Sequence, residues 1–258
     1  MILDEIVAHK RVEVAARMAR RSAAEVAAAA QRLPAAPDFR AALASPELAV
    51  IAEIKGASPS AGTIRGRYDP VGVAAAYEAG GAAALSVLTD ERYFHGSWED
   101  LTAVAQGSRL PVLCKEFIVD PYQIDEARAA GAAAVLLIAR VLSPEDLRAY
   151  LGYARRRGLG ALVEVHSQDE VRAALDADAD CMAINNRDLR TLRVDLETTA
   201  QLRPLIPDGV VVVSESGFER REQVAWVERL GVDAILVGTT LMASGNPAET
   251  LRELRGVR

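Results

Sequence analysis

A pair of charged residues follows an apolar run early in the chain. Residues 48–52 have the pattern of a buried strand, and Glu53 and Lys55 come next, with one residue between them. In an extended strand both side chains point to the same face. Because burying an unpaired charge is costly, we expect the two to pair. The loop at 56–60 is rich in Gly, Ser and Pro, so we interpret this point as the mouth of an active site; a purely structural ion pair is the other interpretation.

Lysine is rare in this chain. Of the 30 basic residues only Lys10, Lys55 and Lys115 are lysines, and the rest are arginines. Lys55 and Lys115 both end apolar strand patterns. An arginine keeps its proton at working pH, whereas a buried lysine can release one. The two lysines at strand ends are therefore candidates for proton transfer.

Strand and helix patterns alternate from residue 48 onward. Eight apolar runs predict strands, and the segments between them carry helix start signals such as Asp69-Pro70 and Asp120-Pro121. The strands are expected at 48–55, 82–88, 110–115, 132–138, 160–165, 181–185, 210–215 and 233–238. The helices are expected at 70–79, 97–106, 120–130, 143–157, 167–177, 195–203, 219–230 and 246–255.

This alternation predicts a parallel sheet covered by helices. Gly81, Gly131 and Gly231 each end a helix pattern before a strand, and their spacing fits a βα unit of about 25 residues. Eight such units make an α/β fold, the (β/α)8 TIM barrel. A doubly wound sheet usually has a Gly-rich turn after its first strand, which residues 56–60 do not match. We expect one domain, 1–258, in which an N-terminal helical extension at 1–45, with a helix over 3–31, precedes a barrel at 46–258.

Polar residues gather at the expected carboxyl ends of the strands, where barrel enzymes hold their catalytic groups. They are Glu53, Lys55, Lys115, Glu164, Asn185, Arg187, Ser214, Glu215, Ser216, Gly217, Gly238 and Thr239. Small Gly, Ser and Thr loops after the last two strands are typical of phosphate sites, because their N–H groups can point at the anion. The pattern predicts a phosphorylated small-molecule substrate. Ordinary turns and structural ion pairs are the alternative for each residue taken alone.

Composition limits the classes of function. A net charge of −6 argues against nucleic-acid binding. Cys114 and Cys181 lie far apart, without disulfide or metal-site spacing, so we expect a reducing, cytoplasmic location. The N-terminus lacks the pattern of a signal peptide, and no run is long enough to span a membrane. His9, His95 and His166 are isolated and are interpreted as surface or packing residues, so neither a metal nor a cofactor is predicted.

Six motifs together resemble one family. They are Glu53-Ile54-Lys55-Gly56-Ala57-Ser58-Pro59-Ser60, Leu113-Cys114-Lys115-Glu116-Phe117, Leu162-Val163-Glu164-Val165-His166, Ile184-Asn185-Asn186-Arg187-Asp188-Leu189, Ser214-Glu215-Ser216-Gly217 and Leu236-Val237-Gly238. In order and extent they are similar to the indole-3-glycerol-phosphate synthase family, which also has a helical extension before the first strand. The resemblance implies a step of tryptophan biosynthesis. In that step 1-(2-carboxyphenylamino)-1-deoxyribulose 5-phosphate closes to an indole ring and loses carbon dioxide and water.

The resemblance also implies roles for residues. Lys115 corresponds to the acid on the ketone oxygen during ring closure, and Glu164 and Lys55 to the acid and base of dehydration, with the division between them open. Glu53 would tune the lysines and contact substrate, and Asn185 would orient it. The remaining contacts implied are substrate-binding Ser58, Phe117, Arg187 and Ser216, and phosphate-binding Gly217, Gly238 and Thr239.

The chain departs from the family pattern in places. Gly56 and Ala61 stand where members often have basic residues, so the first loop is expected to be less positive and more mobile. Thr239 stands where Ser is common and keeps the hydroxyl. We expect no fused isomerase domain after the last helix, and a monomer or weak homo-oligomer.

Two other functions fit the same barrel. One is an aldolase-like enzyme in which Lys115 or Lys55 forms a Schiff base with a sugar phosphate. The other is a non-catalytic binder of phosphorylated metabolites that docks a partner through its N-terminal helix. Borohydride trapping would detect the first, and binding without indole formation would indicate the second.

Overall fold

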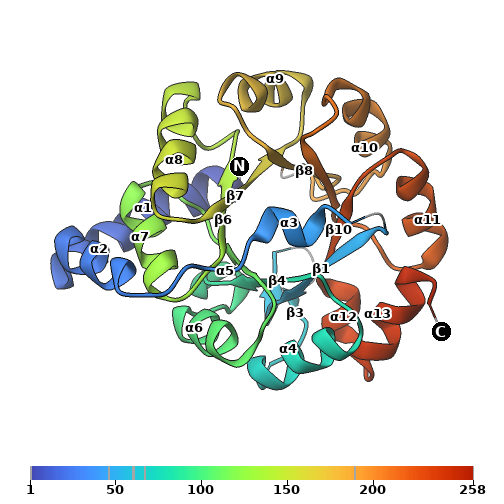
Figure 1. Ribbon diagram of the computed structural model, residues 1–258, viewed down its shortest axis with the longest axis horizontal. Helices are drawn as coiled ribbons and strands as arrows, with labels where there is room; N and C mark the ends of the chain where they lie inside the picture. The colour runs from blue at the N-terminus through green and yellow to red at the C-terminus, as the bar shows by residue number, and fades with distance from the viewer. Residues whose placement is uncertain (1, 46, 60–61, 67, 189, 258) are drawn as a thin grey trace.

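Eight parallel strands close into a barrel (Figure 1). The computed structural model describes residues 2–45, 47–59, 62–66, 68–188 and 190–257. In sequence order the barrel strands are β1 (Ala49–Ile54), β4 (Ala84–Leu88), β5 (Val112–Lys115), β6 (Ala134–Ile138), β7 (Gly160–Val165), β8 (Cys181–Asn185), β9 (Val211–Glu215) and β10 (Ala234–Val237). Each pairs with its neighbours in this order, and β10 pairs with β1. The predicted TIM barrel is confirmed.

Helices surround the barrel where the start signals predict them. They are α4 (Pro70–Ala79), α6 (Trp98–Gly107), α7 (Pro121–Ala129), α8 (Pro144–Arg156), α9 (Gln168–Asp176), α10 (Glu197–Leu202), α11 (Arg221–Arg229) and α13 (Pro247–Arg255). Asp69, Asp120 and Ser143 cap α4, α7 and α8 through their side chains, each followed by a proline in the first turn. A short 3-10 helix, Arg203–Leu205, extends α10.

Four short elements in the connecting loops were not predicted. They are the hairpin strands β2 (Ala57–Ser58) and β3 (Gly62–Thr63), and the one-turn helices α5 (Glu91–Phe94) and α12 (Thr239–Ala243). Each has five residues or fewer, too short for a hydrophobic period to show. Ser60 and Ala61 of the first loop, and Leu189 of the Asn185 motif, lie outside the described residues.

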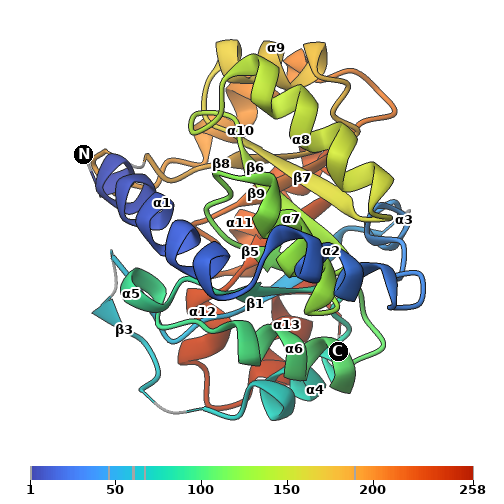
Figure 2. The same ribbon diagram turned by 90° about the vertical axis from the view of Figure 1, so that its left-hand side faces the viewer.

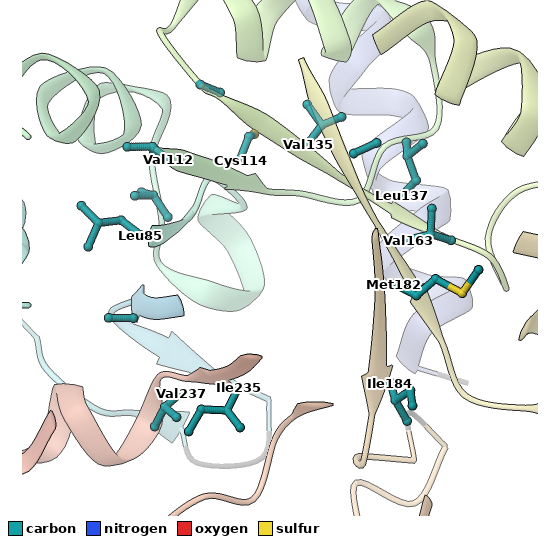
Figure 3. Close-up of a cluster of buried hydrophobic side chains, with 14 of the residues drawn as sticks. Leu85, Val112, Cys114, Val135, Leu137, Val163, Met182, Ile184, Ile235 and Val237 are labelled. Carbon is teal, nitrogen blue, oxygen red and sulfur yellow. The ribbon is translucent and has the colours of Figure 1, made fainter. Parts of the chain in front are cut away.

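The strands alternate between two layers of apolar side chains, as the two-residue period of a strand requires. One set faces outward and packs against the helices; Figure 3 shows members of it from neighbouring strands, among them Val135, Leu137 and Val163. The other set faces the barrel interior and includes Ile51 and Leu162. Both faces of every barrel strand are therefore covered, which is why the strands have nearly continuous apolar sequences.

The N-terminal extension is helical over the expected span of 3–31 and forms two helices, α1 (Ile2–Arg20) and α2 (Ala23–Gln31). Ser22 and Glu25 form a capping box that starts α2 and turns the chain. The span is thus divided at this signal, which the apolar stripe alone does not reveal.

The extension and a following short helix lie at opposite ends of the barrel. Figure 2 shows α1 toward one side and α3 (Phe39–Leu43) toward the other. Phe39 and Leu43 pack with the interior residues at the amino-terminal ends of the strands and close that end. Across the described residues no helix is both long and apolar enough to cross a bilayer.

Candidate active site

The inward-facing positions of the strands end in polar residues at the carboxyl end of the barrel. Leu113 faces the interior, and Lys115 follows it two residues later on β5; on β7 the same relation joins Leu162 to Glu164. Three further strands end in the same way, with Glu53, Asn185 and Glu215. A period of two therefore carries each polar side chain onto the axis of the barrel, where all can meet.

These side chains line one cavity of about 730 Å³. All twelve site residues expected from the sequence contribute to it: Glu53, Lys55, Ser58, Lys115, Phe117, Glu164, Asn185, Arg187, Ser216, Gly217, Gly238 and Thr239. The structure thus brings the expected residues together, while their individual roles stay predictions. Apolar side chains from the strands and from α1 complete the wall.

Lys115 stands between two glutamates. Its Nζ lies 3.0 Å from Glu164 Oε2 and 3.4 Å from Glu215 Oε1. Burial alone would lower the pKa of the Lys115 ammonium. The surrounding carboxylates, Glu164 first, outweigh burial and hold that pKa above its usual range. Lys115 is therefore a charged proton donor that faces the cavity.

Glu164 and Glu215 have opposite pKa shifts although they are neighbours. Burial raises the pKa of both carboxyl groups. For Glu164 the positive charges of Lys115 and His166 reverse that effect and lower the pKa to about 2. For Glu215 the negative charge of Glu164 adds to burial, so its pKa rises well above the usual range and it can donate a hydrogen bond to Glu164. The pair therefore offers one ionised base and one protonated acid.

Glu53 and Lys55 form the ion pair that their spacing predicts. Lys55 Nζ lies 2.6 Å from Glu53 Oε1, and both groups line the cavity. The pair rests on Gly238 at the end of β10. A Cβ atom at Gly238 would stand 2.3 Å from Glu53 Oε1 and 2.9 Å from Lys55 Nζ. Glycine is needed at this position because the pair occupies the space of a side chain.

Asn185 and Arg187 shape the loop after β8. Asn185 Oδ1 accepts a hydrogen bond from the backbone N–H of Arg187 at 3.0 Å, and the Arg187 guanidinium donates to the Leu192 carbonyl oxygen at 2.9 Å. Burial lowers the pKa of Arg187, while Glu53 and Glu215 act in the opposite direction. Asn185 therefore both forms the turn after β8 and lines the cavity. The charges of the Glu53 and Glu215 carboxylates act on the Arg187 guanidinium.

The loops after β9 and β10 form a polar corner of the cavity. Ser216 and Gly217 both have positive φ, +74° and +97°, which turns the backbone sharply at the end of β9. Thr239 begins α12, and the hydroxyl of Thr240 donates to the Phe218 carbonyl oxygen at 2.6 Å. This bond ties the two loops together at one corner of the cavity.

An apolar wall faces this polar corner. Ile2, Leu3 and Ile6 of α1 line the cavity together with Phe94 and Phe117, whose rings lie 5.8 Å apart. Sequence analysis did not assign the α1 residues or Phe94 to the site. The only signal was the apolar stripe of α1, and a stripe does not tell which surface it covers. This wall is suited to a flat aromatic group.

The third lysine is buried behind the wall. Lys10 is fully buried on the inner face of α1, and its Nζ lies 2.9 Å from Asp90 and 3.1 Å from Glu116. Glu116, the residue after Lys115, points into this cluster. Burial by itself would lower the pKa of Lys10, but Glu116 and Asp90 hold it above its usual range. Among the described residues no group of three or more His, Cys, Asp and Glu side chains is arranged for a metal ion.

Comparison with known proteins decides the family. A family model described as indole-3-glycerol phosphate synthase matches residues 3–254. The chain belongs to the indole-3-glycerol phosphate synthase family. The resemblance in the six motifs is thereby confirmed.

Curated members of the family are similar over their whole length. The chain is 44% identical over 258 residues to indole-3-glycerol phosphate synthase of Dehalococcoides mccartyi strain CBDB1, with 98% of this chain and 100% of the relative covered. It is 47% identical over 257 residues to the enzyme of Acidithiobacillus ferrooxidans strain ATCC 53993, with 98% of each covered. The activity predicted from the sequence is confirmed: this chain is a carboxy-lyase of tryptophan biosynthesis that forms indole-3-glycerol phosphate.

More distant solved structures share the fold alone. 3-Hexulose-6-phosphate synthase from Salmonella typhimurium has a TM-score of 0.66 at 15% identity and covers 81% of this chain and 97% of its own. A tryptophan synthase α-subunit mutant from Pyrococcus furiosus has a TM-score of 0.62 at 15% identity and covers 81% and 98%. Family membership, and not these likenesses, decides against the aldolase and the non-catalytic binder.

Two residues, Glu215 in the cavity and Lys10 behind its wall, were within reach of sequence reasoning but received no role. Glu215 stands at the end of an apolar strand, as Glu164 does, so the same reasoning could have chosen it. In the sequence it could equally be an ordinary turn residue, and only its central position beside Lys115 in the structure shows the difference. Lys10 interrupts the buried stripe of α1 formed by Leu3, Ile6 and Val14. A charge in the middle of an apolar stripe indicates a buried partner, which in this case is Glu116.

Proposed function

We propose that Lys115, Glu164 and Lys55 perform the acid and base steps on 1-(2-carboxyphenylamino)-1-deoxyribulose 5-phosphate. The observation that carries this proposal is the 3.0 Å contact between Lys115 Nζ and Glu164 Oε2 on the wall of the cavity. The surrounding charges keep Lys115 protonated and Glu164 ionised at neutral pH, so the acid and the base are each present in the form that the reaction needs.

Ring closure uses Lys115 as the acid. The aromatic carbon that bears the carboxylate attacks the ketone carbon, and the ketone oxygen takes a proton from Lys115 Nζ to become a hydroxyl. The carboxylate then leaves as carbon dioxide, and the electrons of the broken bond restore the aromatic ring. The charge that develops on the ketone oxygen explains why a fixed ammonium is needed at this place.

Dehydration uses the two sides of the barrel mouth. Lys55 follows β1 and Glu164 lies on β7, so the substrate lies between them. Lys55 donates a proton to the departing hydroxyl, which leaves as water. Glu164, ionised because of its low pKa, accepts the proton from the ring carbon next to nitrogen. Glu215 keeps a proton beside Glu164, and Glu53 holds Lys55 in place.

The remaining cavity residues bind the two ends of the substrate. The phosphate lies at the polar corner against the backbone amides of Gly217, Gly238 and Thr239, with Ser216 beside them. The aromatic ring lies against Phe117 and the α1 wall. Ser58, Asn185 and Arg187 contact the parts between, and Arg187 is suited to an anionic group because its guanidinium cannot lose its proton.

The test is to replace Glu164 with Gln and measure indole formation from the synthetic substrate. Loss of the carboxylate removes the base, so kcat should fall by at least ~100-fold. Glu197→Gln, an exposed change on α10, serves as the matched control and should leave kcat unchanged. Near-normal turnover by Glu164→Gln would remove this residue from the chemistry.

We further propose that the enzyme acts in the cytoplasm as a monomer or weak homo-oligomer, with residues 1–45 and 46–258 as one folding unit. Both cysteines are free and buried, which suits a reducing compartment. The cluster around Lys10 joins the extension to the barrel, which supports one unit. Light scattering on purified protein tests the oligomeric state, cell fractionation tests the location, and a single unfolding transition tests the unit.

A further inference from the structure

His166 lies directly behind Glu164. It follows β7, its side chain is only 5% exposed, and it is not among the residues that line the cavity. Its Nε2 atom lies 3.3 Å from Glu164 Oε1. That nitrogen is buried and makes no hydrogen bond of good geometry among the described residues, although Glu164 Oε1 lies close to it. The ring thus faces the carboxylate oxygen that Lys115 does not use.

The other side of the ring is held by α9. Glu170 Oε2 accepts a hydrogen bond from the backbone N–H of His166 at 2.7 Å and lies 3.2 Å from His166 Nδ1. Glu170 is itself fixed, because Arg140 Nε donates to its other oxygen at 2.8 Å. Both ring nitrogens therefore face carboxylate oxygens. A ring that carries a proton on each nitrogen can satisfy both, and a neutral ring can satisfy one.

Charges alternate along this line of contacts. From the surface inward the order is Arg140, Glu170, His166, Glu164 and Lys115. Glu215 is a further ionisable group beside Glu164, and burial together with the Glu164 charge raises its pKa. His166 thus lies between two carboxylates, and each of them has a basic partner on its far side.

We propose that His166 is a positioning residue that fixes the orientation of the Glu164 carboxylate. It holds Oε1 through Nε2, so that Oε2 alone faces Lys115 and the substrate. The inference rests on the role of Glu164 as base proposed above. Without the imidazole ring, both oxygens of Glu164 can turn to the Lys115 ammonium. The carboxylate then no longer points at the substrate carbon from which it takes the proton.

The proposal predicts a separation of kcat from KM. His166→Gln should lower kcat by about 10-fold or more with KM within a factor of about two, because a base out of line slows chemistry and leaves binding intact. Glu170→Gln should lower kcat in the same direction by less. The double variant should be no slower than His166→Gln alone, since both changes break one line of contacts.

The split of kcat from KM is a readout that a packing role would not produce, because lost packing lowers the folded fraction and leaves kcat per folded molecule unchanged. His9→Gln, which removes a partly exposed ring from α1, is the matched control and should keep kcat and KM.

The outcomes separate the two proposals. If His166→Gln keeps kcat within a factor of about two while Glu164→Gln loses ~100-fold, the positioning role is wrong and the proposed function stands. If Glu164→Gln also turns over normally, the proposed function itself fails. If His166→Gln loses activity only in proportion to its unfolded fraction, the ring is a packing residue and the inference is overturned.

Discussion

Two buried lysines of this enzyme meet carboxylates in similar ways but lie in different surroundings. Lys10 is 0% exposed, and Glu116, its partner, accepts further hydrogen bonds on both oxygens, from the Phe117 N–H and the Thr89 hydroxyl. Lys115 is 14% exposed and faces the cavity. The difference shows that a buried ion pair does not by itself indicate chemistry. What makes the Lys115 cluster reactive is the open side that a substrate can reach.

The largest effect is expected at Lys10. Lys10→Met leaves the carboxylates of Asp90 and Glu116 buried without their cation, so the free energy of unfolding should fall by about 3 kcal/mol. Turnover per folded molecule should change little. Urea denaturation and kcat measure the two, and Arg11→Met, an exposed change on the same helix, is the control. If Lys10→Met instead lost as much kcat as Lys115→Arg at unchanged stability, Lys10 would not be the structural cation that distinguishes it from Lys115.

Lys115→Arg should have the opposite effect, with stability kept and turnover lost. The charge is kept, so the free energy of unfolding should change by less than about 1 kcal/mol. Because the planar guanidinium does not place an N–H group where the compact Lys115 ammonium stands, kcat should fall by at least ~100-fold, about 2.7 kcal/mol in the barrier. Arg109→Lys, an opposite exchange at a site with 94% side-chain exposure, should be neutral in both assays. Normal turnover of Lys115→Arg would place Lys115 with Lys10 as a structural cation.

Gly238→Ala tests the ion pair between Lys55 and Glu53, which lies against the backbone of Gly238. The new methyl group must displace Glu53 or Lys55, because its Cβ would stand 2.3 Å and 2.9 Å from their charged atoms. We expect kcat/KM to fall by about 10-fold, since the pair and the phosphate corner both shift. Gly245→Ala, with no atom within 4 Å of the new Cβ, is the control. An unchanged kcat/KM would show that the pair moves without consequence.

The pH dependence of stability should have opposite sign in the two clusters. Burial raises the pKa of Glu164, but Lys115 and His166 bring it down to about 2, below the usual 4.5. Its contribution to stability is therefore present above pH 4.5 and is lost as pH falls toward 2. For Glu116 burial outweighs Lys10 and raises the pKa, so its ionisation opposes folding as pH rises.

Urea denaturation from pH 3 to 7 measures this difference. The stability gap between the unchanged enzyme and Glu164→Gln should narrow as pH falls below 4.5, with a slope of up to about 1.4 kcal/mol per pH unit for one proton. The gap for Glu116→Gln should change in the other direction. If the stability gaps of Glu164→Gln and Glu116→Gln changed with pH by the same slope, the two carboxyl groups would have pKa shifts in the same direction.

Much of the fold and the site followed from local patterns. Apolar runs of strand length, capped helix starts such as Asp120-Pro121, and polar residues at strand ends predicted the barrel and ten of the twelve expected cavity residues, whereas Ser58 and Phe117 came from the family resemblance. Ser214, also placed at a strand end, does not line the cavity, because its hydroxyl is buried against Asn186 and Thr199. The break at Ser22 was also within reach, because its capping box lies in four consecutive residues. Helix α5 could not be predicted from the sequence, because a four-residue helix is too short to show a hydrophobic period.

The sequence by itself determined which residues are apolar, where strands and helices start, and that Glu53, Lys115 and Glu164 end their strands. Only the tertiary structure decided that Lys10 meets Glu116, 106 residues away, and that α1 covers the cavity. It also decided that Glu164 is ionised and Glu215 protonated. The reason is physical: secondary structure depends on near neighbours, whereas ion pairs and pKa shifts depend on distances that exist only once the barrel has closed.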